Sequence, residues 1–186
     1  MSSSNKKYFD KGVFTLSLDT ELAWGMIDKP ISLINNKEYF YNTRKVIDKI
    51  IELLEKYQIS ATWAVVGALL LERPSFEDEF IKSITRNLND KVKKLYIDLL
   101  HKEEIWCGKD IIKKVKSCSV PQEIGSHSFS HLIFSDSHVS KDEAYKDFSE
   151  GMTILKEEGL QPISFVFPRN SIKYLKELRN AGFRAY

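Results

Sequence analysis

The chain has 186 residues, of which 42% are hydrophobic and 12% aromatic, which is enough apolar material for a folded core and too much for a disordered chain. Lys and Arg total 28 against 26 Asp and Glu, and this net charge of +2 gives no argument for nucleic acid or an anionic membrane as a partner, so we expect no nucleic-acid partner. No apolar run approaches the roughly 20 residues that are needed to cross a bilayer.

The two cysteines, Cys107 and Cys118, are too few and too isolated for a disulfide framework or a CxxC metal site. The N-terminal residues 1–11 include lysines, but no hydrophobic run follows them as it would in a signal peptide. We therefore expect a flexible tail over residues 1–11, one domain over residues 12–186 and a cytoplasmic location.

The first half of the chain contains two strand patterns and one long helical pattern. Residues 13–19 alternate apolar and small polar side chains, which is typical of a strand. Residues 38–57 are predicted to form a helix, because apolar side chains recur at helical spacing on one face. These positions are Tyr39, Val46, Ile47, Ile50, Leu54 and Tyr57. Residues 59–67 are β-branched, aromatic and closed by a glycine, which indicates a buried strand.

Residues 72–118 differ from their surroundings in being rich in lysine and arginine. Apolar side chains at Ile84, Leu88, Leu95 and Leu99 keep a helical period through part of the segment. The pattern predicts a helical insertion with a solvated basic face, and a surface for an acidic polymer is the alternative.

Strand and helix patterns return in the last third of the chain. Residues 123–127 resemble a short strand that enters a loop, and residues 163–168 resemble a buried strand. Between them, Ser140 and Glu143 form a capping box that opens a helix, and Gly159 ends it. The inner face of this helix is expected to consist of Tyr145, Phe148, Met152 and Leu155.

A short helix over residues 171–181 and the beginning of a strand over residues 183–186 complete the chain. This order of strands and helices predicts an α/β protein with parallel strands. Because the sequence ends inside an apolar strand pattern, we expect the last elements of the fold to be missing.

Two carboxylates, Asp19 and Glu21, follow the first predicted strand. They are two residues apart, so their side chains point to the same side of an extended chain. Ligands of parallel α/β folds collect at the carboxyl ends of strands, which makes this pair a candidate site. An ordinary solvated loop is the alternative.

Two of the four histidines, His127 and His131, follow another predicted strand. On one helical turn this spacing would bring both imidazoles to a single cation. Together with a carboxylate from the other strand end they would suit zinc or a similar divalent ion, with positions left open for water and substrate. The alternative is one buried, hydrogen-bonded histidine and one exposed histidine.

Three further side chains lie near predicted strand ends. Arg169 would orient a carboxylate or bind an anionic group of a substrate, and a surface salt bridge is the alternative. Trp24 and Trp63 offer aromatic faces on which a sugar ring could stack, and core packing is the alternative.

Taken in this order, the segments resemble the polysaccharide deacetylase family of metal-dependent carbohydrate esterases. Residues 17–21 (SLDTE) resemble its acidic first motif, and residues 127–131 (HSFSH) its H-[ST]-x-x-H motif. Residues 167–170 (FPRN) resemble its Arg/Pro motif, and residues 61–67 (ATWAVVG) its second strand. The resemblance extends over about residues 14–186.

The resemblance implies a distorted (β/α) barrel of seven or eight strands, of which about five are present here. It also implies a carbohydrate substrate and the removal of an N- or O-acetyl group from a sugar. Glu21, His127 and His131 would hold one divalent metal, best suited to Zn²⁺, and Asp19 would be the general base. The implied substrate-binding residues are Arg169, Trp24 and Trp63.

The sequence departs from the family pattern at three points. Asp19 and Glu21 replace two adjacent aspartates, so the choice of metal ligand between them stays open. Arg169 follows Pro168, whereas the family places the arginine before the proline. The histidine that serves the family as general acid would lie beyond Tyr186, so we expect this chain alone to be a weak catalyst or none.

Two other functions stay open at this point. One is hydrolysis of a non-peptide C–N bond in a small metabolite, which divergent members of the fold perform. The other is a non-catalytic, metal-stabilised domain that binds carbohydrate.

Overall fold

The structure is a computed structural model that describes residues 10–74 and 76–186, so most of the expected N-terminal tail lies outside the described residues. The strands are β1 (Ser17–Thr20), β2 (Thr62–Val65) and β3 (Glu123–Ser126). The 3-10 helices are η1 (Leu22–Met26), η2 (Gly67–Leu70) and η3 (Pro168–Asn170). The α-helices are α1 (Pro30–Asn35), α2 (Lys37–Lys56), α3 (Asp78–Thr85), α4 (Asp90–Leu100), α5 (Glu103–Trp106), α6 (Lys109–Lys116), α7 (Lys141–Glu157) and α8 (Leu175–Asn180).

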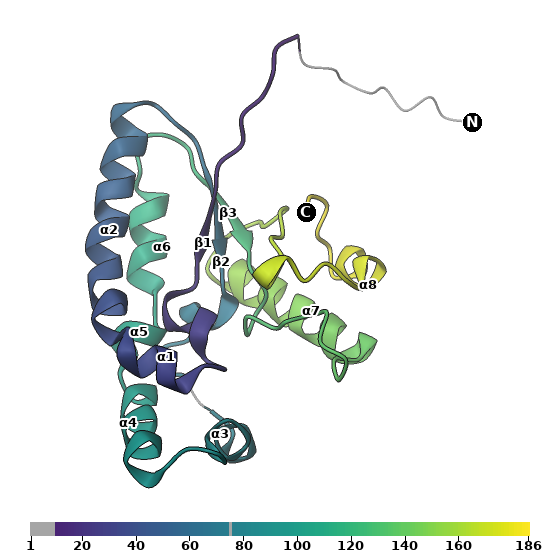
Figure 1. Cartoon of the computed structure of the whole chain (residues 1–186). Helices are drawn as coiled ribbons and strands as arrows, with labels where there is room; N and C mark the ends of the chain where they lie inside the picture. Colours follow the sequence, from purple (N-terminus) through teal and green to yellow (C-terminus); the bar gives the residue numbers. More distant parts are fainter. Residues whose placement is uncertain (1–9, 75) are drawn as a thin grey trace.

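A three-stranded parallel sheet in the order β1-β2-β3 forms the centre of the molecule. Leu18 is paired with Trp63, and Trp63 with Ile124. In Figure 1, α2 and α6 lie on one side of these strands, and α7 and α8 lie on the other. Because the strands run in the same direction, their carboxyl ends meet at one edge of the sheet.

The first predicted strand is shorter than expected. β1 begins at Ser17, and residues 13–16 are not part of a strand, although the Leu16 carbonyl accepts a hydrogen bond from the Thr62 amide. Val13 and Phe14 are 59% and 86% exposed, so burial does not hold them against the sheet.

The last two predicted strands are reduced to single bridges that continue the sheet beyond β3. Residues 163–168 form one parallel bridge to β3 and one to residues 183–186, instead of longer strand pairings. The bridges join Ser126 to Phe165 and Ser164 to Ala185. The five expected segments therefore lie in one order across the sheet, as in part of a distorted barrel.

The long predicted helix is confirmed as α2, but its inner face differs from the prediction. The buried positions recur every seven residues at Phe40, Ile47 and Leu54. Three positions expected to be inside are more than half exposed: Tyr39, Val46 and Tyr57. Tyr39 and Val46 each lie one residue, or about 100° around the helix axis, from this buried stripe, and Tyr57 lies beyond the end of α2.

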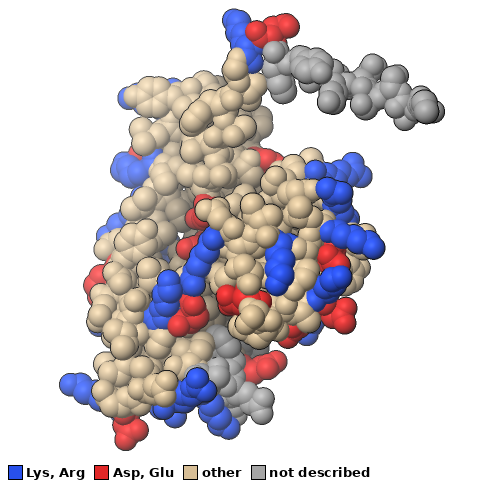
Figure 2. All heavy atoms as spheres, turned by 45° about the vertical axis from the view of Figure 1, so that its right-hand side comes forward, with Lys and Arg blue, Asp and Glu red and all other residues tan. Residues whose placement is uncertain are grey.

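The lysine-rich segment contains four helices, α3 to α6, that pack into the main core. Tyr96, Trp106 and Ile111 are buried in the same apolar cluster as Trp63. Its basic side chains also pair with acidic groups of other elements, as Lys114 does with Asp48 of α2 at 2.6 Å. Figure 2 shows Lys and Arg side chains lying among Asp and Glu side chains on one face of the molecule.

A second apolar cluster lies between α7, α8 and the segments after β3. Phe148 of α7 stacks on Phe134, with ring centroids 4.5 Å apart. Phe165 meets Phe148 edge to face at 5.1 Å, and Phe183 is buried against Phe165. This cluster fixes α7 beside the carboxyl end of β3.

The capping box predicted for α7 is present: Ser140 accepts from the Glu143 amide, and Glu143 accepts from the Ser140 amide. The predicted inner face is wrong at Tyr145, which is 45% exposed, and Ala144 is buried in its place. The same face buries one charged residue, Asp147.

The helix predicted over residues 171–181 is shorter and begins only at Leu175. Tyr174 has a left-handed backbone (φ 59°), as do the preceding Arg169 and Asn170, and this conformation interrupts a right-handed helix. Gly182 (φ 110°) follows α8 in the left-handed conformation that commonly ends a helix.

No helix in the part of the chain that the structure describes combines the length and the apolar character that crossing a membrane requires.

Candidate metal centre

The carboxyl ends of β1 and β3 bring two predicted site segments together across β2. Backbone hydrogen bonds continue past the strands, from the Val66 amide to the Thr20 carbonyl (3.1 Å) and from the His127 amide to the Val65 carbonyl (2.7 Å). Glu21 and His127 are therefore the first residues after two strands that flank the same central strand. The parallel arrangement positions both side chains at one edge.

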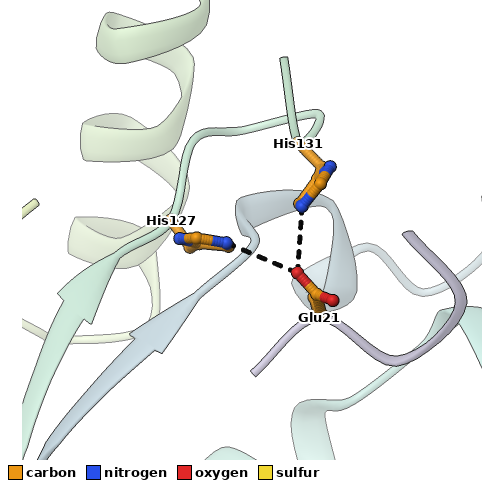
Figure 3. A group of neighbouring side chains, drawn as sticks. All are labelled: Glu21, His127 and His131. Carbon is orange, nitrogen blue, oxygen red and sulfur yellow. Dashed lines mark ion pairs between the residues drawn. The ribbon is translucent and has the colours of Figure 1, made fainter. Parts of the chain in front are cut away.

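Three side chains converge at this edge: Glu21, His127 and His131. Their potential ligand atoms all lie within 4.8 Å of one another. Oε2 of Glu21 lies 2.9 Å from Nε2 of His131 and 3.4 Å from Nε2 of His127. Figure 3 shows the two imidazoles pointing at the carboxylate from the loop after β3.

Glu21 is held in a tight turn that leads into η1. Its carbonyl accepts a hydrogen bond from the Trp24 amide at 3.0 Å, and Leu22 adopts a left-handed backbone (φ 45°). The carboxylate folds over Gly25: a Cβ atom at that position would lie 2.0 Å from Oε1 of Glu21. The absence of a side chain at Gly25 therefore leaves the space that this carboxylate occupies.

The His127 ring is oriented by a hydrogen bond on its far side. Nδ1 lies 2.8 Å from the Val166 carbonyl oxygen, in the segment beside β3. A carbonyl oxygen only accepts, so Nδ1 carries a proton. In the neutral ring, Nε2 then presents its lone pair toward Glu21, which is the state that a metal ligand requires.

The spacing of the two histidines predicted that they would lie on one helical turn, but they do not. Residues 127–131 form a loop in which Ser128 (φ 72°) and His131 (φ 61°) are left-handed. This loop folds back so that the imidazole centroids lie 5.3 Å apart. Both rings are buried, with 1% and 6% of His127 and His131 exposed.

The electrostatics of the cluster favour an ionised carboxylate. Burial raises the pKa of Glu21, but in the metal-free protein the protonated imidazoles of His127 and His131 donate hydrogen bonds to this carboxylate, and these bonds and the imidazolium charges outweigh burial and lower the pKa to about 2. Glu21 is thus an anion at neutral pH.

Asp19 lies at the edge of the cluster. Its Oδ2 is 3.9 Å from Nε2 of His127, and its side chain is 53% exposed, against 34% for Glu21. Asp19 therefore reaches the same site from the solvent side.

Arg169 binds the carboxylate of Asp28. Its guanidinium donates to both oxygens of Asp28, at 3.0 and 2.7 Å, and to the Gly25 carbonyl at 3.0 Å. These bonds join the η3 segment to the turn that carries Glu21. Arg169 therefore forms a salt bridge, which was the alternative interpretation, and the carboxylate that it orients is Asp28 of the protein itself.

Trp24 and Trp63 are core residues, with 5% and 1% exposed. The Trp24 indole donates to the Trp106 carbonyl at 2.9 Å, and the Trp63 indole donates to Gln122 at 3.2 Å. The expectation that these rings stack on a sugar is thus corrected, because protein covers them and core packing accounts for both.

Three residues that shape the site were missed in the sequence. Asp147 could have been found from the sequence, because its helical spacing places an acidic residue on the buried face of α7. Asp28 and Gly25 had none, because their roles depend on contacts with Arg169 and Glu21 that spacing along the chain does not encode.

Residues 28–186 match the model of the polysaccharide deacetylase family, and the chain belongs to this family. The match includes both histidines and Arg169 but begins after Asp19 and Glu21. A comparison with curated proteins gives no significant match.

Two solved structures are similar to this chain. One is the deacetylase PplD of Streptococcus pyogenes in complex with acetate, at 14% identity and a TM-score of 0.51, covering 96% of this chain. The other is IcaB from Ammonifex degensii, at 14% identity and a TM-score of 0.45, covering 91% of this chain and 80% of IcaB. The chain spans 57% of the PplD chain, and the similarity to PplD supports the deacetylase-like α/β fold.

Proposed function

We propose that this protein is a metal-dependent hydrolase that removes an acetyl group from an N-acetylated or O-acetylated sugar of a polysaccharide. The observation that carries the proposal is the convergence of Glu21, His127 and His131 at the carboxyl edge of the sheet. Membership of the polysaccharide deacetylase family supports the substrate class. The similar PplD structure contains acetate, which is the product that this proposal expects.

The donor set fits a divalent cation, and Zn²⁺ suits it best. Two imidazoles and one carboxylate provide three protein ligands, which is the number typical of catalytic zinc and leaves positions open. The ring orientation of His127 and the ionised state of Glu21 both suit this role. When bound, the cation would polarise the acyl carbonyl and make a nearby water more acidic.

The chain's own groups would bind the cation and move the proton. Glu21, His127 and His131 would be the ligands. Asp19 is close to them but more exposed, so its Oδ2 would accept the proton of the attacking water as general base. Arg169 would keep the turn of Glu21 in place through Asp28 and the Gly25 carbonyl.

The test is acetate release from N-acetylglucosamine oligomers by the Zn²⁺-loaded protein, compared with its Asp19→Asn variant. We expect slow release by the parent protein, loss of release in the variant and an unchanged zinc content in both. Asp98, an exposed residue of α4, gives the matched control Asp98→Asn, which should behave like the parent.

Other outcomes would contradict the proposal in defined ways. Bound zinc without acetate release from N- or O-acetylated sugars would indicate a non-catalytic domain. Loss of zinc in Asp19→Asn would reverse the roles of Asp19 and Glu21.

A further inference from the structure

The helix α7 directs one buried carboxylate at the loop that carries the two histidines. Asp147 is 5% exposed, and each of its two carboxylate oxygens accepts two hydrogen bonds. Oδ1 accepts from Ser128 Oγ (2.7 Å) and the Phe129 amide (3.0 Å). Oδ2 accepts from the amide (3.0 Å) and Oγ (2.7 Å) of Ser130. All four donors belong to the three residues that separate His127 from His131.

The conformation of this loop needs external support. Ser128 and His131 are left-handed, a backbone that residues with a Cβ atom rarely adopt without compensating contacts. A loop free to relax toward ordinary backbone angles would carry the two imidazoles apart. The bonds to Asp147 fix the backbone at the turn that brings the rings together.

The opposite side of the loop is bound to η2. The amides of Gly67 and Ala68 donate to the carbonyls of Ser128 and Phe129 at 2.9 and 2.8 Å. A Cβ atom at Gly67 would lie 3.0 Å from the Phe129 ring, so the glycine permits this close approach. The loop is therefore clamped between η2, which binds its carbonyls, and α7, which binds its amides and hydroxyls.

We propose that Asp147 is a positioning residue for the metal centre: it holds the loop of residues 128–130 so that His127 and His131 meet at one cation. The inference rests on the proposed metal-binding function and adds a residue that acts without being a ligand. Asp147 acts through Ser128, Phe129 and Ser130, whereas Val166 orients His127 independently through its carbonyl.

A carboxylate is the group that satisfies this arrangement. Two of the four donors are backbone amides, which cannot reverse their role, and they lie on different oxygens of Asp147. An asparagine has one acceptor oxygen and one NH₂ group, so one of the two amides would face a donor. A buried amide left without an acceptor is destabilising, and the loop would shift to relieve it.

The experiment is a Co²⁺ titration of the metal-free protein, followed by the visible absorption of the bound ion. For Asp147→Asn we expect the dissociation constant to rise about 10- to 100-fold, the range that removal of a residue supporting metal ligands produces. The absorption bands should also change, because the ligand geometry changes. The control Glu157→Gln removes the same charge from an exposed position of α7 and should bind Co²⁺ like the parent.

The outcomes separate this inference from the proposed function. If the parent protein binds no Co²⁺, the metal centre itself is wrong. If the parent and a folded Asp147→Asn bind Co²⁺ with the same affinity and spectrum, the centre stands and the positioning role is overturned. A purely structural role would lower the unfolding temperature without moving the dissociation constant.

A milder variant keeps the inference testable if Asp147→Asn does not fold. Ser130→Ala removes one donor to Oδ2 and leaves the other three bonds in place. The loss of one such hydrogen bond should raise the Co²⁺ dissociation constant about 2- to 10-fold. An unchanged constant in folded Ser130→Ala would overturn the proposal.

Discussion

The carboxylate of Glu21 lies 2.9 Å from Nε2 of His131, and the two residues belong to the segments that follow β1 and β3, the strands on either side of β2. β2 separates these strands, so the contact forms only when all three strands are paired in register. The cluster of Glu21, His127 and His131 therefore depends on the pairing of the three strands.

The first prediction concerns the space over Gly25. In Gly25→Ala, the new Cβ atom would overlap the Glu21 carboxylate and force it away from the histidines. We expect the dissociation constant for Zn²⁺ to rise about 10-fold or more while the protein stays folded, because Gly25 does not need a left-handed backbone. Competition with a chromophoric chelator measures the constant.

Gly12→Ala is the matched control, since nothing lies within 4 Å of a Cβ atom there. Equal zinc affinity in the two alanine variants would show that Glu21 is not a ligand in the conformation described.

The second prediction concerns the bond between Asp28 and Arg169. Burial raises the pKa of Asp28, but hydrogen bonding to Arg169 and its charge outweigh this and lower it below its usual value. A lowered pKa in the folded state contributes stability above the unfolded-state value, near pH 4, and that contribution is lost as the pH falls through the folded-state pKa.

Asp28→Asn should therefore reduce the free energy of unfolding at pH 7 by about 0.5–1 kcal/mol, a small value because solvent screens this partly exposed pair. The difference from the parent should be constant between pH 7 and 5 and should shrink at pH 3. Urea unfolding at the three pH values measures it. A difference that persists at pH 3 would assign the effect to something other than this ion pair.

The general position of the candidate metal centre was predictable from the sequence, but its local geometry was not. Alternating and β-branched patterns located the strands, and parallel strands place Glu21 and His127 at one edge. The left-handed turn at Ser128 was not predictable, because its support comes from Asp147 on a distant helix. The spacing of the histidines predicted a helical turn, but contacts with distant parts of the chain hold these residues in a loop instead.

The inner faces of the helices were predicted only in part, and the reason is related. Helical spacing identifies an apolar stripe, but which of two adjacent residues is buried at its margin depends on the surface that the helix packs against. At α7 the stripe includes Ala144 and Phe148 but not Tyr145, since Phe134 and Phe165 form the surface that receives it.

The third prediction follows from the apolar cluster that fixes α7. Phe148→Ala should reduce the free energy of unfolding by about 3–5 kcal/mol, because it leaves a cavity among rings that surround a fully buried side chain. Tyr145→Ala, on the exposed side of the same helix, should change it by less than about 0.5 kcal/mol. Urea unfolding compares the two, and a larger loss in Tyr145→Ala would contradict the orientation of α7.

The most direct test of the account is the metal content of the purified protein, determined by elemental analysis after Zn²⁺ loading and gel filtration. We expect close to one zinc per chain in the parent and less than a tenth of that in His131→Ala and Glu21→Gln, with His101→Ala, an exposed histidine, as the control that keeps its zinc. A parent protein that is folded but retains no zinc, or a His131→Ala variant that retains it fully, would contradict the assignment of Glu21, His127 and His131 as one metal site.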